Sequence, residues 1–205
     1  MVVSEPNHNG KKERQDVIFN AACRVIREKG YHQARIADIA QEAGISYGLV
    51  YHYYKGKAHL FDAILDEWWS GLYSMLDRSI SDDSSIEEKL GAVISYFLDQ
   101  YDARPNLVHI FITQISRSSE NLTPMRLSDF KRFMQKTETI IAKAQAEGVL
   151  RTDCKARYLT YVFLGAMETF LSAMVLENQP LKGKSQKLRI QEALLKLFLD
   201  GARSR

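Results

Sequence analysis

Cysteine is scarce in this chain, with only Cys23 and Cys154 among 205 residues. The two are far apart and each sits in an apolar helical context, which favours buried free thiols over a metal site or a disulfide. Unpaired thiols fit a reducing compartment, and we expect a cytoplasmic protein. The five histidines show no metal-ligand spacing; His59 and Asp62 lie one helical turn apart, as exposed residues often do. The sequence therefore predicts no metal and no cofactor.

Long apolar runs are also missing. No stretch approaches about 18 consecutive uncharged apolar residues, which argues against a membrane span and a membrane partner. The first residues, MVVSEPNHNGKKERQD, carry no apolar segment after their positive charges, so we expect no secretory signal. We expect residues 1–12 to form a disordered polar arm.

The motifs of common enzyme classes are absent. The chain contains no nucleophile elbow, no phosphate-binding loop and no dinucleotide-binding glycine pattern. We therefore expect no catalytic residues. Two rival interpretations stay open: an enzyme without those motifs, and a helical scaffold that never meets DNA. Such a scaffold would show no salt-dependent binding to a duplex.

Proline is rare, with four in the chain, and β-branched runs are short, so almost every segment is expected to be helical. Apolar residues recur at helical spacing between Gly, Ser and Thr boundaries. Ser46 offers an N-cap for the third helix, and a Ser-x-x-Glu capping box starts at Ser84 or Ser85. Thr123 precedes a proline and offers a cap, and Asp153 offers another. The predicted helices cover about 13–29, 36–43, 46–53, 57–79, 84–103, 106–116, 123–148, 153–177 and 184–202. The predicted fold class is all-α, with three short helices followed by six mostly longer ones.

Charge is unevenly distributed along the chain, although its formal net value is only +3. Residues 1–57 hold nine Lys and Arg against six Asp and Glu, which gives +3. Residues 58–181 hold twelve Lys and Arg against seventeen Asp and Glu, a net charge of −5. Residues 182–205 hold seven Lys and Arg against two Asp and Glu, a net charge of +5. The positive N-terminal part is compatible with a nucleic-acid face, although basic tails are common for other reasons.

The stretch AGISYGLVYHYYKGK crowds tyrosines onto one short predicted helix. Two short helices joined by a glycine-containing turn match the helix-turn-helix, whose second helix enters the DNA major groove. On a helical wheel Val50 and Tyr54 face the preceding helix, while Tyr47 and Tyr51 face outward. Tyrosine hydroxyls bind phosphates or base edges, and their rings pack against thymine methyls. The alternative is that the cluster only fills a core.

Residues 30–61, GYHQARIADIAQEAGISYGLVYHYYKGKAHLF, resemble the DNA-binding signature of the TetR family of bacterial transcriptional repressors. Three positions depart from the family pattern: Ala34 replaces the usual capping threonine, Tyr54 the usual phenylalanine, and Ala58 the usual acidic residue. The operator sequence does not follow, because Tyr47 occupies a variable base-reading position. The matching positions are Ile39, Ala40, Ala43, Gly44, Ser46, Gly48, Tyr51, Tyr53, Lys57 and Leu60.

This resemblance implies an N-terminal three-helix DNA-binding domain with a helix-turn-helix at 13–57 and a six-helix ligand-binding and dimerisation domain at 58–205. It implies a repressor that binds a palindromic operator on double-stranded DNA and is released by a small-molecule inducer. The DNA-binding residues it implies are Tyr47, Gly48 and Tyr51 at the bases, and Ser46, Tyr53, Lys57, His52 and Arg35 at phosphates and the rim.

The last two predicted helices are candidates for a homodimer interface. LTYVFLGAMETFLSAMVL is apolar nearly all round, and such a helix is either central or shared between chains. A four-helix seam between two symmetric copies is expected, with burial inside one chain as the alternative. The expected interface residues are Gly165, Ala166, Ala173, Ile190, Leu194, Leu197 and Phe198.

Large aromatic and methionine residues between these parts suit a mainly apolar cavity, although each one singly is more often core. TQISRSSENLTPMRLSDFKRF is similar to the fatty-acid-degradation branch of the TetR family. That similarity implies long-chain acyl-CoA as the inducer; a planar hydrophobic drug or an aromatic acid fits the same composition. The expected ligand-binding residues are Trp68, Tyr96, Tyr101, His109, Gln114, Arg117, Phe130, Phe133, Met134, Tyr161, Met167 and Phe170, with Gln114 and Arg117 as polar anchors.

Overall fold

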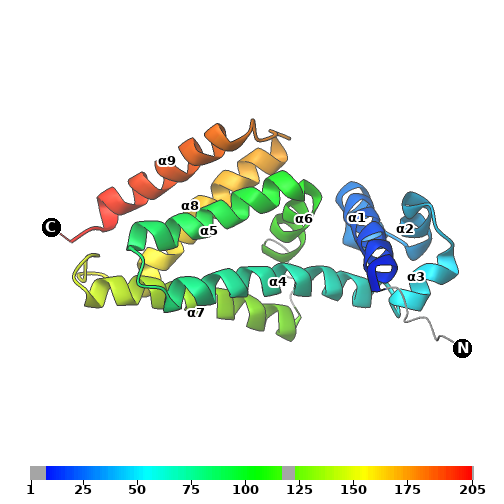
Figure 1. Cartoon of the computed structure of the whole chain (residues 1–205), viewed down its shortest axis with the longest axis horizontal. Coiled ribbons are helices and arrows are strands. Elements are labelled where there is room, and N and C mark those ends of the chain that lie inside the picture. Colours follow the sequence, from blue (N-terminus) through cyan, green and yellow to red (C-terminus); the bar gives the residue numbers. More distant parts are fainter. Residues whose placement is uncertain (1–7, 117–122, 205) are drawn as a thin grey trace, which may run out of the picture. The chain divides into compact units, whose positions relative to one another are not determined.

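A computed structural model of the chain describes residues 8–116 and 123–204. Within these ranges it contains nine α-helices and a π-helical segment, and the single extended pairing is an isolated bridge between Leu150 and Arg203 (Figure 1). The predicted all-α class is confirmed. The chain divides into two units, Met1–Trp68 and Trp69–Arg205, and the division falls inside α4 (Lys57–Ser81).

The first unit holds three helices and the first half of α4 around one core. The apolar stripe predicted for its first helix is buried, and it packs on the second helix, which in turn packs on the third. Buried Leu60 and Phe61 of α4 complete the core. The helices are α1 (His8–Gln33), α2 (Ile36–Ala43) and α3 (Tyr47–Tyr53).

The first helix differs from its prediction at both ends. It begins at His8, so residues 8–12 are helical rather than part of a disordered arm; Lys, Glu and Arg around this start are good helix formers. Near its end Gly30 adopts a non-helical conformation, φ 76° and ψ 160°, that favours glycine. A further turn follows, in which the Ala34 N–H donates to the Gly30 carbonyl at 3.1 Å.

The turn between α2 and α3 has the geometry that the sequence predicts. Gly44 is left-handed, φ 65° and ψ 31°, and the Ile45 N–H donates to the Ala40 carbonyl at 3.0 Å, which closes α2. Ser46 then caps α3, because its Oγ accepts the Leu49 N–H at 3.3 Å. Two short helices are thereby joined by a tight turn.

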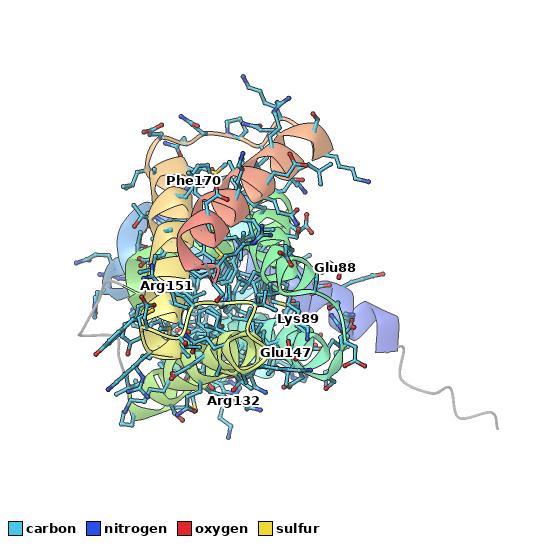
Figure 2. The ribbon with its side chains drawn as sticks, turned by 90° about the vertical axis from the view of Figure 1, so that its left-hand side faces the viewer. Glu88, Lys89, Arg132, Glu147, Arg151 and Phe170 are labelled. Carbon is cyan, nitrogen blue, oxygen red and sulfur yellow. The ribbon has the colours of Figure 1, made fainter. Side chains whose placement is uncertain are left out.

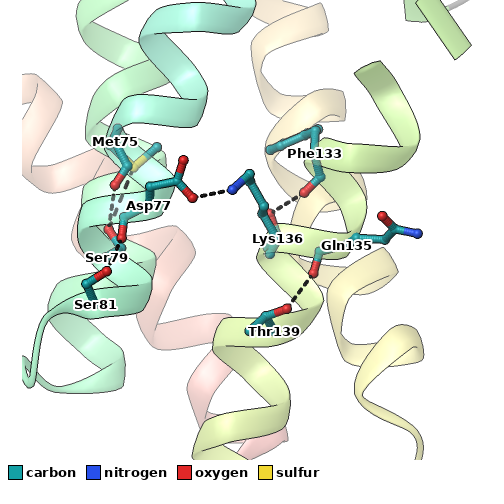
Figure 3. Close-up of polar contacts among 9 residues, drawn as sticks. Met75, Asp77, Ser79, Ser81, Phe133, Gln135, Lys136 and Thr139 are labelled. Atoms are coloured by element: carbon teal, nitrogen blue, oxygen red, sulfur yellow. Dashed lines mark hydrogen bonds and ion pairs between the residues drawn. The ribbon is translucent and has the colours of Figure 1, made fainter. Parts of the chain in front are cut away.

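The second unit is a helical bundle that begins with the remainder of α4. In Figure 1 α9 lies over α5 and α8, and α7 packs against both α5 and α8. Figure 3 shows the ion pair between Asp77 of α4 and Lys136 of α7. The Tyr73 hydroxyl adds a bond to the Asp129 carbonyl at 2.8 Å. The helices are α5 (Ile86–Ala103), α6 (Pro105–Ile110), α7 (Pro124–Ala146), α8 (Ala156–Leu176) and α9 (Lys184–Ala202).

Two predicted caps are present in the second unit. At the start of α5, Ser85 Oγ accepts the Glu88 N–H at 3.2 Å and the Ser85 N–H donates to Glu88 Oε2 at 2.8 Å, a reciprocal capping box. At the start of α7, Thr123 Oγ1 accepts the Arg126 N–H at 3.3 Å. Of the two serines left open by the sequence, Ser85 is therefore the cap.

Two other helix predictions need correction. Asp153 does not cap α8, because its carboxylate pairs with Arg151 Nε at 2.6 Å and the helix begins after Lys155. The helix expected over 106–116 is α-helical only to Ile110, and residues 111–116 continue as a π-helix. There Thr113 Oγ1 donates to the His109 carbonyl at 2.8 Å, a side-chain bond that disturbs a regular ladder.

The apolar character of α8 qualifies the expectation that no segment could span a membrane. By length and composition alone α8 could do so, with a mean hydropathy of 1.6 over its most apolar window. Half of that window is buried inside the bundle, where Phe163, Leu164 and Leu171 point inward. The core helix of a bundle has the same composition, and that packing accounts for it here.

Candidate nucleic-acid interface and ligand cavity

The two faces of α3 differ sharply in exposure. Val50 is fully buried and Tyr54, directly after the helix, is 7% exposed, whereas Tyr47 and Tyr51 are 53% and 44% exposed. Burial is the main cause that raises the pKa of Tyr54. The Tyr47 and Tyr51 rings lie 4.9 Å apart, and the Tyr47 hydroxyl donates to the Tyr51 hydroxyl at 3.2 Å. That hydrogen bond raises the pKa of Tyr47.

The remaining predicted residues of α3 border this exposed pair. Gly48 is exposed, and a Cβ built on it would meet nothing within 4 Å. His52 is exposed and contacts the half-buried Tyr53 ring edge-on, with centroids 5.2 Å apart. Ser46 is exposed at the N-cap. The structure therefore exposes Tyr47, Gly48, Tyr51 and His52 of α3 together with Ser46 at its N-cap, whereas Tyr53 is half-buried.

Arg35, and not Ala34, is the N-cap residue of α2, and Ala34 before it is buried. Asp38 supplies the missing cap: its Oδ2 accepts the Arg35 N–H at 3.0 Å, and its Oδ1 pairs with Lys29 Nζ at 3.0 Å. Lys29 first and the Arg35 N–H second lower the pKa of the Asp38 carboxyl. Arg35 remains exposed. The role of Asp38 was not foreseen, although a carboxylate three residues into a helix is its signal.

Lys57 has partners within the protein. Its Nζ donates to the carbonyls of Tyr31 at 2.8 Å and His32 at 3.0 Å, and it lies 4.7 Å from the centroid of the Tyr31 ring. The same ring packs against Phe61 with centroids 4.5 Å apart. Lys57 therefore joins the end of α1 to the start of α4.

A cavity of about 660 Å³ lies within the second unit, chiefly between α7 and α8. Aromatic and aliphatic side chains form most of its wall. Of the predicted ligand-binding residues, it includes Phe130, Phe133, Met134, Tyr161 and Met167. The cavity is also lined by Phe111 and Glu168, and by residues that the sequence did not single out for it: Phe97, Val108, Ile112, Leu127, Lys131, Gln135, Glu138, Arg157, Leu164, Gly165 and Leu171.

Several predicted ligand contacts lie elsewhere. Trp68 is buried in the first unit, and the Tyr96 hydroxyl lies against Gly71, 2.6 Å from where a Cβ would stand. The Tyr101 hydroxyl bonds to the carbonyls of Gln179 at 2.7 Å and of Met174 at 3.1 Å, so it fastens the end of α8. None of these three side chains lines the cavity.

Two further predicted ligand contacts, His109 and Phe170, also fall outside the cavity wall. Phe170 is labelled on α8 in Figure 2. The side chain of Gln114 and the whole of Arg117 lie outside the described residues, so their proposed role as polar anchors stays a prediction.

Charged side chains of α7 and α8 border the cavity. Lys131 and Glu138 come from α7, Arg157 and Glu168 from α8, and Arg157 Nε pairs with Glu138 Oε2 at 3.3 Å. Composition could not single out Lys131, Glu138 and Arg157, because charged residues on helices usually face solvent. The spacing of residues 131, 135 and 138 along one face of α7 was the available signal.

The predicted dimer residues divide into three groups. Ala166, Ala173 and Leu197 are exposed, Leu197 by 76%, and Ile190 and Leu194 are half-buried. Gly165 instead lines the cavity. Phe198 is 8% exposed and packs on the Phe163 ring with centroids 5.2 Å apart, so it fills the core of one chain.

Comparison with known proteins decides the family. The model of bacterial regulatory proteins of the tetR family matches residues 18–64, and that of the C-terminal region of YsiA-like protein matches residues 66–200. The chain belongs to the TetR family. As a TetR-family protein it is a DNA-binding transcriptional regulator and not an enzyme. The predicted family and general function are confirmed.

Relatives of this TetR-family protein include regulators of fatty acid metabolism. The fatty acid metabolism regulator protein of Bacillus subtilis is 22% identical over 191 residues, 93% of this chain and 96% of the relative. The structure of the fatty acid degradation regulator FadR from Bacillus halodurans superposes with a TM-score of 0.79, 20% identity and coverage of 99% and 100% of the two chains. The structure of FadR from Bacillus subtilis, solved in complex with stearoyl-CoA, superposes with a TM-score of 0.69 and 21% identity. The match covers 91% of this chain and 98% of that chain.

Proposed function

We propose that this TetR-family protein is a cytoplasmic repressor that binds a palindromic operator as a homodimer and leaves it on binding an apolar small molecule, with long-chain acyl-CoA as the first candidate. The apolar cavity of the second unit carries the ligand half of this proposal. Its volume of about 660 Å³ falls among small-molecule sites, which span roughly 300–1,000 Å³.

The exposed side of α3 supports the DNA-binding half. Tyr47, Gly48 and Tyr51 would face bases, because they are exposed on the helix that follows the turn. Around them Ser46, His52, Tyr53 and Arg35 would contact phosphates or the rim of the groove, whereas Lys57 would mainly hold α1 to α4. Two protons of the Lys57 ammonium are already committed to carbonyls, so at most one remains for a phosphate.

Acyl-CoA joins a long apolar chain to a polyanionic head, and the cavity offers surfaces for both. The aromatic wall around Phe111 and Phe133 suits the chain. Lys131 is exposed at the cavity, where its ammonium could meet an anionic group. The relative solved with stearoyl-CoA motivates this choice among apolar ligands.

The exposed apolar side of α8 and α9 supports a homodimer. Val162 is 62% exposed, Leu176 66% and Leu197 76%, and Tyr158 adds 54%. Exposed apolar surface of this kind on neighbouring helices is typical of an interface between chains. A two-fold dimer would place two copies of α3 for two half-sites of a palindrome.

Release by acyl-CoA is the first prediction. The full chain is titrated onto a fluorescent duplex from the region upstream of its own gene, and stearoyl-CoA is added at fixed protein concentration. Because a ligand shifts an equilibrium only through differential affinity, we expect the apparent Kd for DNA to rise at least tenfold and then saturate. Free CoA and stearate, added in separate titrations, show whether the polyanionic head or the acyl chain of the ligand is needed for release. An unchanged Kd with all three, but a rise with an aromatic acid, would reject acyl-CoA as the ligand.

Replacing Lys57 with Met tests whether that ammonium mainly holds α1 to α4. We expect the free energy of unfolding to fall by about 1.5 kcal/mol or more, since two charged hydrogen bonds are removed. DNA affinity should fall while the slope of log K against log[salt] stays unchanged. Lys55→Met, which removes an exposed neighbouring cation, is the control for net charge. Unchanged stability, together with a log K against log[salt] slope that is less steep by about 0.9, would instead make Lys57 a phosphate ligand.

A further inference from the structure

The exposed side of α3, the recognition helix of the proposed complex, lacks the side chains that usually contact bases. α3, YGLVYHY, contains no Arg, Lys, Asn, Gln, Asp or Glu. Bidentate contacts to guanine come from Arg or Lys, and those to adenine from Asn or Gln. The exposed side chains of α3 are Tyr47, Tyr51 and His52, so sequence recognition by this helix needs different chemistry.

Tyr47 and Tyr51 satisfy part of each other's hydrogen-bonding capacity. The Tyr47 proton is donated to the Tyr51 oxygen at 3.2 Å, and the rings stand 4.9 Å apart with planes at 55°. Their remaining exposed surface is largely ring carbon. Gly48, whose Cβ position is empty to 4 Å, leaves the backbone beside the pair uncovered and permits close approach.

We infer that the Tyr47–Tyr51 pair reads thymine C5-methyl groups in the major groove. This inference rests on the proposed operator binding and specifies its chemistry. The thymine methyl is the apolar group that a T·A pair presents in the major groove, and apolar side chains recognise it by contact. Two adjacent rings held by one hydrogen bond form a preorganised apolar surface for one or two methyls in each half-site.

The test begins with selection of a preferred duplex from a randomised library by the full chain. Each thymine of that duplex is then replaced singly by deoxyuridine, which removes the methyl and keeps the Watson–Crick edge. We expect about a fourfold loss of affinity at one or two positions in each half-site, the value of one buried methylene. A 5-methylcytosine·guanine pair at those positions should bind better than an unmethylated cytosine·guanine pair.

Protein variants connect the methyl effect to the tyrosines. Tyr51→Ala and Tyr47→Ala should bind thymine and deoxyuridine duplexes equally, whereas Val149→Ala, at an exposed apolar residue between α7 and α8, should keep the fourfold difference. A selected duplex that is insensitive to every deoxyuridine substitution would overturn the inference, as would a methyl effect that survives both α3 substitutions. Failure to select any duplex would overturn the proposed function itself.

Discussion

Replacing Gly48 with Leu is expected to abolish specific operator binding while the protein stays folded. A Cβ at position 48 meets nothing within 4 Å, so the fold accommodates a side chain there. In a complex the same space would be occupied by the duplex, and a leucine would hold α3 away from the base edges. Removing one good interaction with a base costs about 1–3 kcal/mol, so removing two reduces affinity by at least about thirtyfold.

Gly48→Ala should change protein stability and operator affinity in opposite directions, because it adds a single methyl group at the same position. Glycine inside a helix is destabilising by roughly 0.5–1 kcal/mol relative to alanine, so the melting temperature should rise while operator affinity falls. Thermal denaturation and fluorescence anisotropy measure the two quantities. Asn20→Leu, on the exposed side of α1, is the control for an added surface leucine. If Gly48→Leu bound the operator as tightly as the unmodified chain, α3 would not approach DNA through this side.

Replacing Met134 with Trp should weaken the response to acyl-CoA without removing DNA binding. Met134 is half-buried in α7 and lines the cavity, and the larger indole would occupy space that the acyl chain needs. We expect at least tenfold more stearoyl-CoA to be required for release from the operator, measured by the same anisotropy titration. The response weakens because the filled cavity binds the ligand less tightly in the state that leaves DNA, so more ligand is needed to shift the equilibrium.

Met134→Leu is the matched control for this substitution. Exchanging Met for Leu nearly conserves volume and usually costs less than about 1.5 kcal/mol. This variant should therefore respond to stearoyl-CoA as the unmodified chain does. Unimpaired release of Met134→Trp would place the ligand outside this cavity. Loss of operator binding by both variants would mean that position 134 supports the fold rather than the ligand.

Local sequence patterns predicted most of the helix boundaries, because caps and apolar stripes depend on neighbours in the chain. Ser46, Ser85 and Thr123 are caps in the structure for the reason that the sequence suggests. Asp153 failed because an equally local partner, Arg151, binds its carboxylate. Where two local arrangements compete, the pattern alone does not choose between them.

Tertiary neighbours decide which of the predicted residues line the cavity. Aromatic and methionine content pointed to Phe133 and Met134, which line it, and also to Tyr101, whose hydroxyl anchors the end of α8. Lys131 and Arg157 were missed, because a charged residue on a helix has the same sequence pattern whether it borders a cavity or open solvent.

The contacts of Lys57 in the first unit also depend on tertiary neighbours that the sequence does not predict. Resemblance implies a phosphate contact, and nothing in the neighbouring sequence points to the carbonyls of Tyr31 and His32. The break at Gly30 and the following turn position those carbonyls, and that geometry is set by the folded unit. Because every residue carries a backbone carbonyl, the sequence does not show which carbonyl accepts a hydrogen bond from Lys57.

The most direct test of the account is photocrosslinking of the full chain to its selected duplex. Each thymine is replaced in turn by 5-iododeoxyuridine, whose iodine occupies the position of the methyl group, and crosslinked peptides are identified by mass spectrometry. The account predicts crosslinks at Tyr47 or Tyr51 from one or two positions in each half-site. Efficient crosslinks that map only outside residues 46–53 would contradict it.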